Sequence, residues 1–229
     1  MFRIACSGRV MKTTTQRISG LYAVTPEWGD TGLLLQAVGL CLEGGARWVQ
    51  YRNKGGDVAL QHEQASELLE LCHRFGARFI VNDNLRLADL IDADGVHLGK
   101  DDASVREARI ILGSKKIIGV SCYNSLQQAL EAEAAGADYV AFGSFFASGT
   151  KPQAVAAPLD LLREAKRRLA ISVVAIGGIT PENAGSLVAA GADALAVIAA
   201  LFDSPDIKTT AQQFVSLFHP YQSELRITP

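Results

Sequence analysis

The sequence has few cysteines and histidines, and neither type forms a recognisable motif. The four cysteines have no CxxC spacing, and the four histidines include no HExxH pair. Zinc sites and a disulfide framework are therefore not indicated. Scattered, unpaired cysteines are typical of a reduced protein, and we expect a cytoplasmic location. The cysteines are Cys6, Cys41, Cys72 and Cys122.

Long runs of one residue type are missing as well. The chain has no cluster of Lys and Arg and its formal net charge is -2, so no nucleic-acid partner is expected. No apolar run is long enough to cross a bilayer, and residues 1–17 lack the hydrophobic segment of a signal peptide. We therefore expect no membrane partner and predict small-molecule substrates. The sequence leaves open whether the chain forms a homo-oligomer.

No linker or shift in composition divides the chain into two domains. Hydrophobic residues make up 48% of its 229 residues, which is enough for one sizeable core. We predict a flexible N-terminal extension over residues 1–18, a catalytic domain over residues 19–219 and a C-terminal tail over residues 220–229. Met11 is an alternative start.

Short apolar runs alternate with helical patterns from Gly20 onward. The runs are continuous, as in parallel strands that are covered on both faces. Eight strand and helix units predict an α/β fold, a single (β/α)8 TIM barrel. An open doubly wound sheet is the alternative, but no GxGxxG follows the first strand. The predicted strands are residues 21–24, 48–51, 79–81, 95–98, 117–120, 139–142, 173–176 and 194–197.

The ends of the predicted helices support the same alternation. Several helices end in glycine, then a small residue, then a strand, as in Gly136-Ala137-Asp138 and Gly191-Ala192-Asp193. Glycine just past a helix can take the left-handed conformation, which permits a tight turn into the next strand. The predicted helices are residues 32–43, 58–75, a short segment through 90, 104–112, 125–134, 158–169, 181–190 and 208–218.

Two acidic residues follow two neighbouring predicted strands. Asp83 comes just after the strand at residues 79–81, and Asp102 lies in the loop after the strand at residues 95–98. Consecutive parallel strands are usually adjacent, so both carboxylates should lie at one end of the sheet. Mg²⁺ is typically held by one or two carboxylates plus substrate phosphates. The alternative is that Asp83, and either Asp101 or Asp102, only cap the helices that follow.

Basic residues at the same end of the predicted barrel favour an anionic ligand. In such barrels the active site lies at the carboxyl ends of the strands. Arg52, Lys54 and Lys151 follow the second and sixth strands. With the two acids and Mg²⁺ they would neutralise a pyrophosphate, Arg as a planar fork and Lys as a point charge. The alternative is ordinary surface Arg and Lys. Further polar residues at strand ends are Gln50, Asn82, His97 and Ser121.

A second anion site is predicted after the seventh and eighth strands. Gly177 and Gly178 allow close backbone approach, and a short helix can begin at Ile198 with free N–H groups. The alternative is that the glycines only form a tight turn. The loop from Gly143 to Ala157 is longer than most such connections and predicts a lid. The alternative is a flexible connecting segment. Both sites together predict two phosphorylated substrates.

Two reactive side chains near the strand ends have plainer explanations. A lone histidine such as His97 is more often structural than catalytic. Cys122 stands beside Ser121 and resembles a nucleophile, but no adjacent base is evident in the sequence. We therefore expect a structural role for His97 and no catalytic role for Cys122.

A set of motifs occurs in order from Gly20 to Leu201. They are GLYAVT, VQYRNK, FIVNDNLRLA, ADGVHLGKDD, IIGVS, GADYVAFGSFFASGTK, VVAIGGITPENA and AGADALAVIAAL. Singly, GAD and IGGI recur in many phosphate-binding barrels. As an ordered set, the motifs resemble those of the thiamine-phosphate synthase (thiamine-phosphate pyrophosphorylase) family.

This resemblance implies a Mg²⁺-dependent transferase. The family joins a pyrimidine methyl pyrophosphate to a thiazole phosphate, and it releases pyrophosphate and makes thiamine monophosphate. The resemblance implies that Asp83 and Asp102 hold Mg²⁺ and that Gln50 orients the pyrimidine. The leaving pyrophosphate would be bound by Arg52, Lys54, Asn82, Ser121 and Lys151, and catalysis would rest on Arg52, Lys54, Ser121 and Lys151. The thiazole phosphate would be held by Ser148, Thr150, Gly178 and the backbone of Ile198 and Ala199.

Several positions depart from the family pattern. Asn53 stands where Glu is frequent, and Ala199 stands where Ser is frequent but keeps its backbone N–H. The other departures are Ser144 and Ala147 in place of Pro, Ser148 in place of Thr and Tyr123 in place of His.

Three other functions, two enzymatic and one non-catalytic, are compatible with parts of this pattern. A thiazole tautomerase does not need the metal and pyrophosphate ligands, which are present in this sequence. A phosphosugar isomerase would use the second anion site and leave the first cluster unexplained. A non-catalytic ligand-binding relative could lose a metal carboxylate, whereas this chain has both.

Overall fold

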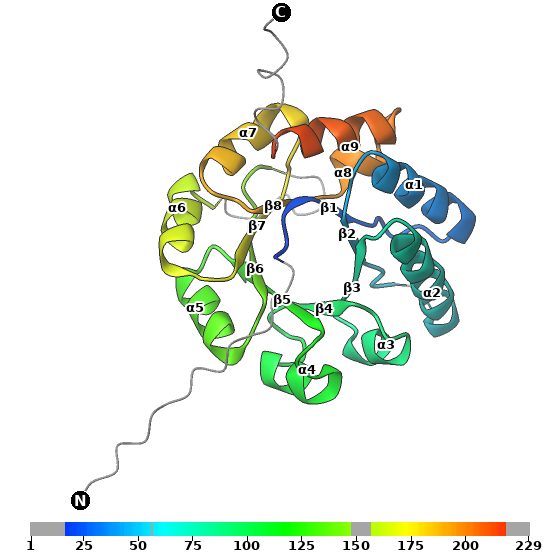
Figure 1. The fold of residues 1–229 in the computed structure, drawn as a ribbon, viewed down its shortest axis with the longest axis horizontal. Coiled ribbons are helices and arrows are strands. Elements are labelled where there is room, and N and C mark those ends of the chain that lie inside the picture. The colour runs from blue at the N-terminus through cyan, green and yellow to red at the C-terminus, as the bar shows by residue number, and fades with distance from the viewer. Residues whose placement is uncertain (1–16, 56, 148–156, 219–229) are drawn as a thin grey trace, which may run out of the picture.

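Eight parallel strands close into a barrel, and the helices surround it (Figure 1). The structure, a computed structural model, describes residues 17–55, 57–147 and 157–218. Each strand pairs with the next one in sequence, and β8 pairs with β1, so the sheet has no open edge. The predicted (β/α)8 barrel is confirmed. The strands are β1 Gly20–Val24, β2 Trp48–Tyr51, β3 Arg78–Asn82, β4 Gly95–Leu98, β5 Ile117–Tyr123, β6 Tyr139–Phe142, β7 Ser172–Ile176 and β8 Ala194–Val197.

The helices lie close to their predicted positions, with differences of a few residues at their ends. Strand β5 continues to Tyr123, three residues beyond its predicted end at Val120. A separate short helix, α8, follows β8 and precedes α9. The helices are α1 Thr31–Glu43, α2 Val58–Arg74, α3 Leu85–Leu90, α4 Val105–Leu112, α5 Leu126–Ala135, α6 Leu159–Arg168, α7 Pro181–Ala189, α8 Ala199–Phe202 and α9 Ile207–Ser216.

The glycines that follow the helices have the predicted backbone conformation. Gly136 follows α5 with φ of 102°, and Gly191 follows α7 with φ of 103°. Side chains other than glycine rarely adopt this conformation. The turns then lead directly into β6 and β8, which explains why the Gly-Ala-Asp motif precedes both strands.

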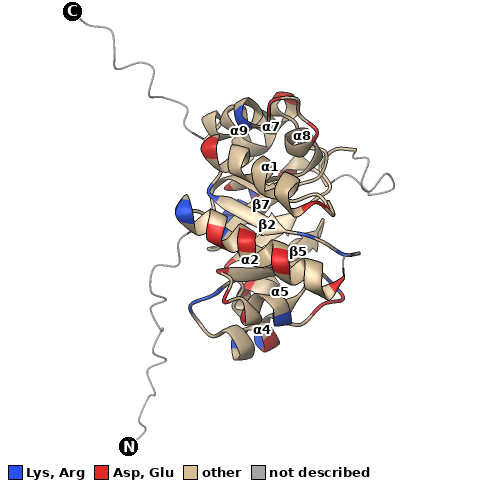
Figure 2. Cartoon of the chain, turned by 90° about the vertical axis from the view of Figure 1, so that its right-hand side faces the viewer, with Lys and Arg blue, Asp and Glu red and all other residues tan. Residues whose placement is uncertain are grey.

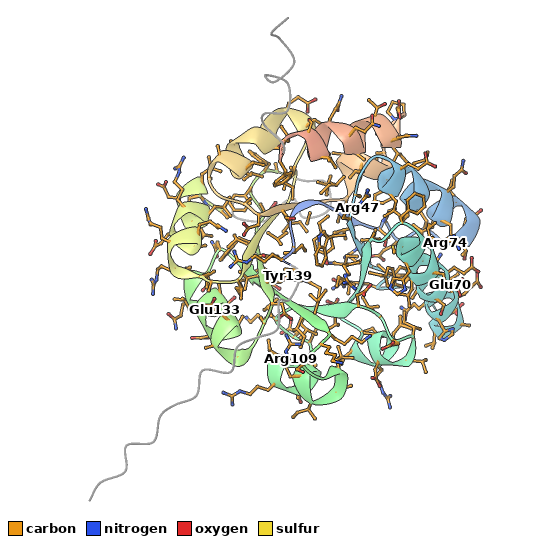
Figure 3. All side chains as sticks on the ribbon, viewed as in Figure 1. Arg47, Glu70, Arg74, Arg109, Glu133 and Tyr139 are labelled. Atoms are coloured by element: carbon orange, nitrogen blue, oxygen red, sulfur yellow. The ribbon has the colours of Figure 1, made fainter. Side chains whose placement is uncertain are left out.

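A repeated aspartate clamp joins neighbouring strands at the N-terminal end of the barrel. Asp94, Asp138 and Asp193 immediately precede β4, β6 and β8. Each carboxylate accepts a backbone N–H from the strand before: Phe79 N at 2.9 Å, Ile118 N at 2.8 Å and Val173 N at 2.7 Å, respectively. Each carboxylate also forms an ion pair with a basic side chain: Asp94 with Arg78, Asp138 with Arg109 and Asp193 with Lys166. Arg109 is labelled in Figure 3.

The barrel interior is filled by side chains that alternate along the strands. Tyr22, Trp48, Ile80 and Tyr139 belong to one buried cluster inside the barrel, and a larger cluster lies between the strands and the helices. Ile18 is 3% exposed and packs into the inner cluster, although it falls within the predicted extension. The boundaries of the predicted extension and tail stay predictions, because residues 1–16 and 219–229 lie outside the described residues.

The outer surface shows no segregation of charge on the side drawn in Figure 2, where acidic and basic residues are mixed over the helices. This mixture is in line with the formal net charge of -2. Among the described residues, no helix combines the length and the apolar character needed to span a bilayer.

Candidate active site

Two carboxylates meet where β3 and β4 end. Asp83 directly follows β3, has φ of 60° and donates its backbone N–H to His97 O at 2.8 Å. Asp102 lies in the loop after β4 and accepts the Gly99 N–H at 2.7 Å. A Cβ atom at Gly99 would lie 2.9 Å from Asp102 Oδ2 and 3.9 Å from Asp83 Oδ1. Both carboxylates therefore face the same small volume above Gly99.

Neither carboxylate caps a helix. Helix α3 is capped by Asn84, whose side chain accepts the Leu87 N–H at 3.0 Å. Helix α4 is capped by Ser104, which forms a reciprocal capping box with Glu107. The capping alternative is therefore wrong for both helices, because other side chains already satisfy their first N–H groups.

The surroundings of the two acids shift their pKa values in opposite directions. Burial raises the pKa of Asp83, but the hydrogen bond and charge of Lys54 and the hydrogen bond with Asp102 outweigh it, and the net pKa is lowered. Burial and the neighbouring Asp83 raise the pKa of Asp102. Two carboxylates that repel each other in this way favour a bound cation between them.

The donor set fits Mg²⁺. This metal prefers oxygen ligands, and it is usually held by one or two carboxylates, with water and substrate phosphate completing its shell. The described part of the chain has no group of three or more His, Cys, Asp and Glu side chains suited to a metal. A site with only Asp83 and Asp102 from the protein is therefore open to a phosphate ligand. A cavity of about 480 Å³ reaches Asp102 and Ser121, but it extends between α4 and α5, whose Arg106, Gln128 and Glu131 line it, and Asp83 is not in its lining.

Two of the predicted phosphate-binding cations lie at the end of the barrel where the strands have their carboxyl ends, which we call the mouth. Each of them is paired with an acid. Lys54 Nζ lies 2.9 Å from Asp83 Oδ2. The Arg52 guanidinium forms an ion pair with the Glu27 carboxylate. Each of these long side chains therefore contacts an acid at the mouth in the absence of any anion.

Glu27 and Thr25 contact the predicted ligand Arg52, and the sequence analysis named neither of them. Thr25 is fully buried, and its Oγ1 accepts the Arg52 backbone N–H at 2.9 Å. Glu27 holds the side chain of the same residue. The available signal was their position after the first strand, the strand end for which no ligand was predicted.

A chain of buried polar side chains crosses the inside of the barrel. It runs from Gln50 through Tyr22, Tyr139 and His97 to Ser121, with successive atoms 2.8 to 2.9 Å apart. Tyr139 is labelled inside the barrel in Figure 3. Burial lowers the pKa of His97 to about 4, against the opposing charge of Asp83. His97 is thus an internal hydrogen-bonding residue. It belongs to the chain that connects Gln50 with Ser121, two of the residues predicted to bind substrate.

The predicted second anion site has the expected backbone. Gly177 has φ of 104° and Gly178 has φ of 62°. A Cβ atom at Gly178 would overlap Ala147 O in the loop after β6. The Asn183 side chain donates to Gly178 O at 2.9 Å and fixes the loop. Helix α8 begins at Ala199, directly after Ile198, where the short helix was predicted.

The sequence and the fold both match one family of known proteins. The family described as thiamine monophosphate synthase matches residues 21–201. The chain belongs to the thiamine monophosphate synthase family. A thiamine-phosphate synthase of Thiobacillus denitrificans is 60% identical over 199 residues, which cover 87% of this chain and 94% of the relative. A thiamine-phosphate synthase of Nitrosospira multiformis is 52% identical and covers 89% of this chain and 87% of the relative.

A solved structure of the family agrees with this assignment. The thiamine phosphate pyrophosphorylase from Pyrococcus furiosus superposes with a TM-score of 0.77 at 36% identity, and the match covers 87% of this chain and 95% of that one. The fold and the predicted family are therefore confirmed by independent comparisons.

The structure brings together most of the predicted site residues of this family member. Gln50, Arg52, Lys54, Asn82, Asp83, Asp102 and Ser121 all lie at or near the carboxyl ends of β2 to β5. Gly178, Ile198 and Ala199 follow β7 and β8. Ser148, Thr150 and Lys151, together with most of the predicted lid, lie outside the described residues. The individual binding roles stay predictions.

Proposed function

We propose that the protein is a Mg²⁺-dependent thiamine-phosphate synthase. Its substrates are a pyrimidine methyl pyrophosphate and a thiazole phosphate, and its products are thiamine monophosphate and pyrophosphate. The observation that carries the proposal is the pair Asp83 and Asp102 at the barrel mouth, with Lys54 held beside it. This arrangement suits a metal-bound pyrophosphate.

The reaction needs no nucleophile from the protein. The amino group of the pyrimidine stabilises positive charge on the methylene carbon, so the carbon–oxygen bond breaks first and its electron pair leaves with pyrophosphate. The lone pair of the thiazole nitrogen then forms the new carbon–nitrogen bond. Asp83 and Asp102 would hold Mg²⁺, which would supply positive charge beside the departing pyrophosphate. Arg52 and Lys54 stabilise the same charge as fixed cations.

The second task of the site is to hold the two rings in attacking geometry. Gln50 orients the pyrimidine from inside the barrel, where it is 5% exposed. Asn82 and Ser121 bind the pyrophosphate with Lys151. The thiazole phosphate is held by Ser148, Thr150, Gly178 and the backbone of Ile198 and Ala199.

We also infer a cytoplasmic location. Cys41, Cys72 and Cys122 are free and buried. Burial raises the pKa of Cys72, which keeps this thiol protonated and unreactive. Free thiols in the core are expected of a protein that remains in a reducing compartment.

The test is the release of pyrophosphate by purified protein given both substrates and Mg²⁺. Release should require both substrates, and it should be largely lost in Asp102→Ala and in excess chelator. Asp101→Ala is the matched control, because Asp101 is an exposed acid in the same loop. Its rate should equal that of the wild type.

Two outcomes would contradict the proposal. Full activity in excess chelator would show that the reaction does not need a metal ion. No release by the wild type, with thiazole phosphate still binding, would instead favour a tautomerase or a sensor.

A further inference from the structure

The chain from Gln50 to Ser121 is continuous. Gln50 Nε2 lies 2.9 Å from the Tyr22 hydroxyl, and the Tyr22 hydroxyl lies 2.8 Å from that of Tyr139. The Tyr139 hydroxyl lies 2.9 Å from His97 Nδ1, and His97 Nε2 lies 2.8 Å from Ser121 Oγ. The four links join side chains from β1, β2, β4, β5 and β6.

We propose that Tyr22, Tyr139 and His97 are positioning residues. They determine which group at each end of this chain, on Gln50 and on Ser121, is left to donate or accept a hydrogen bond from the substrate. The proposal rests on the proposed function, since it assigns Gln50 to the pyrimidine and Ser121 to the pyrophosphate. In this role the three residues touch no reacting atom. They act through the orientation of one amide and one hydroxyl hydrogen.

The direction of the chain follows from donor and acceptor chemistry. The Gln50 NH₂ group can only donate, so the Tyr22 oxygen accepts and its hydrogen is directed to Tyr139. The Tyr139 hydroxyl in turn donates to His97 Nδ1. His97 is then the tautomer that carries its hydrogen on Nε2, and this hydrogen is donated to Ser121 Oγ.

The opposite direction leaves a buried hydrogen without an acceptor. If His97 Nδ1 donated, Tyr139 would donate to Tyr22, and the Tyr22 hydrogen would face the NH₂ group of Gln50. Tyr22 is 1% exposed and Tyr139 is fully buried, so no solvent compensates the loss. The same conflict excludes a doubly protonated His97, because its Nδ1 would also donate.

The packing around the chain leaves little room for another arrangement. A Cβ atom at Gly119 would overlap the ring and hydroxyl of Tyr139, so the absence of a side chain at this position makes space for the phenol. The rings of Tyr139 and His97 stack with centroids 5.5 Å apart. The Tyr22 ring meets Tyr139 edge-on at 6.0 Å.

The fixed direction has a consequence at each end. With its NH₂ group turned toward Tyr22, Gln50 directs its carbonyl oxygen to the other side, where it can accept a hydrogen bond from an amino group of a ligand. With its oxygen accepting from His97, Ser121 offers its hydroxyl hydrogen, which suits a phosphate oxygen. Both choices match the proposed pyrimidine pyrophosphate.

The first test reads the tautomer of His97 without any substrate. Long-range proton–nitrogen NMR spectra of the full chain at neutral pH should show His97 in the Nε2–H form. Tyr139→Phe removes the donor to Nδ1, and the Nδ1–H form should then become detectable. A wild-type His97 in the Nδ1–H form, or doubly protonated, would overturn the proposal whether or not the enzyme is active.

The second test is kinetic and has a matched control. Tyr139→Phe should raise KM for the pyrimidine pyrophosphate about tenfold, as expected for one misdirected hydrogen bond, and leave KM for the thiazole phosphate unchanged. Tyr51→Phe is the control. Tyr51 is also buried, faces the helices and donates to Gln64 Oε1 at 2.9 Å. Equal effects of the two variants on KM would overturn the proposal. An inactive wild type would instead contradict the proposed function.

Discussion

Lys54 Nζ lies 2.9 Å from Asp83 Oδ2, so a predicted phosphate-binding cation and a predicted metal ligand form an ion pair in the protein itself. The pair keeps Asp83 ionised in spite of its burial. In the proposed reaction, Lys54 would exchange the carboxylate for a phosphate oxygen of the bound pyrophosphate. Before substrate binds, Lys54 therefore offsets the charge of only one of the two neighbouring carboxylates.

Lys54→Met should lower kcat/KM for the pyrimidine pyrophosphate by at least about tenfold, because a charge-assisted contact to the leaving group is lost. KM for the thiazole phosphate should not change. Steady-state kinetics with each substrate varied in turn provide the measurement. Mg²⁺ should still raise the melting temperature of the variant, because both carboxylates remain.

Asp102→Asn should stabilise the metal-free protein at neutral pH while it abolishes activity. Burial and Asp83 raise the pKa of Asp102 in the folded state above 3.8, so its ionisation opposes folding once the pH exceeds that value. The gain should be no more than about 1 kcal/mol, because the carboxylate is exposed and screened. Urea unfolding at pH 7 and below pH 3.8 tests the sign. A gain that persisted at the lower pH would contradict the assignment.

Glu27→Ala should raise KM for the pyrimidine pyrophosphate and weaken inhibition by pyrophosphate by a similar factor of about tenfold. The reason is that the Arg52 guanidinium loses the partner that orients it. Glu43→Ala breaks the comparably exposed pair with Lys208 far from the mouth and is the control. Tighter pyrophosphate binding in Glu27→Ala would show that Glu27 competes with the ligand.

Gly178→Ala should weaken binding of the thiazole phosphate and lower the free energy of unfolding by about 1–3 kcal/mol. Alanine is strained at φ of 62°, and its Cβ would overlap Ala147 O. Gly185→Ala provides the contrast, since Gly185 lies in α7 with open space around it. It should stabilise the protein by about 0.5–1 kcal/mol. Calorimetry with and without the thiazole phosphate separates the two effects.

The fold could be predicted because its signals are local. Continuous apolar runs, helix-ending glycines and the Gly-Ala-Asp turns each depend on a few neighbouring residues, and Gly136 and Gly191 have the backbone that the motif requires. The candidate ligands after β2 to β5 were predicted from one rule, that barrel sites lie at the carboxyl ends of strands.

The remaining parts of the site depend on contacts between distant segments. Tyr22 and Tyr139 are 117 residues apart in sequence, and within apolar strands they resemble ordinary core residues. The ion pair of Glu27 with Arg52 joins two different loops. Asn84 and Ser104 cap α3 and α4 in place of the nearby aspartates; for α4 the Ser-x-x-Glu spacing of Ser104 and Glu107 was a local signal of this cap.

The aspartate clamps divide the barrel into units of unequal local stability. Asp94, Asp138 and Asp193 fasten β3 to β4, β5 to β6 and β7 to β8 at their N-terminal ends, whereas Arg47 takes the equivalent position before β2. The β1–β2 pair is instead fastened at the mouth, where Thr25 accepts from Arg52. Amide hydrogen exchange should therefore be faster at the start of β1, where Arg47 stands in place of the aspartate, than at the starts of β3, β5 and β7, whose clamped amides belong to Phe79, Ile118 and Val173.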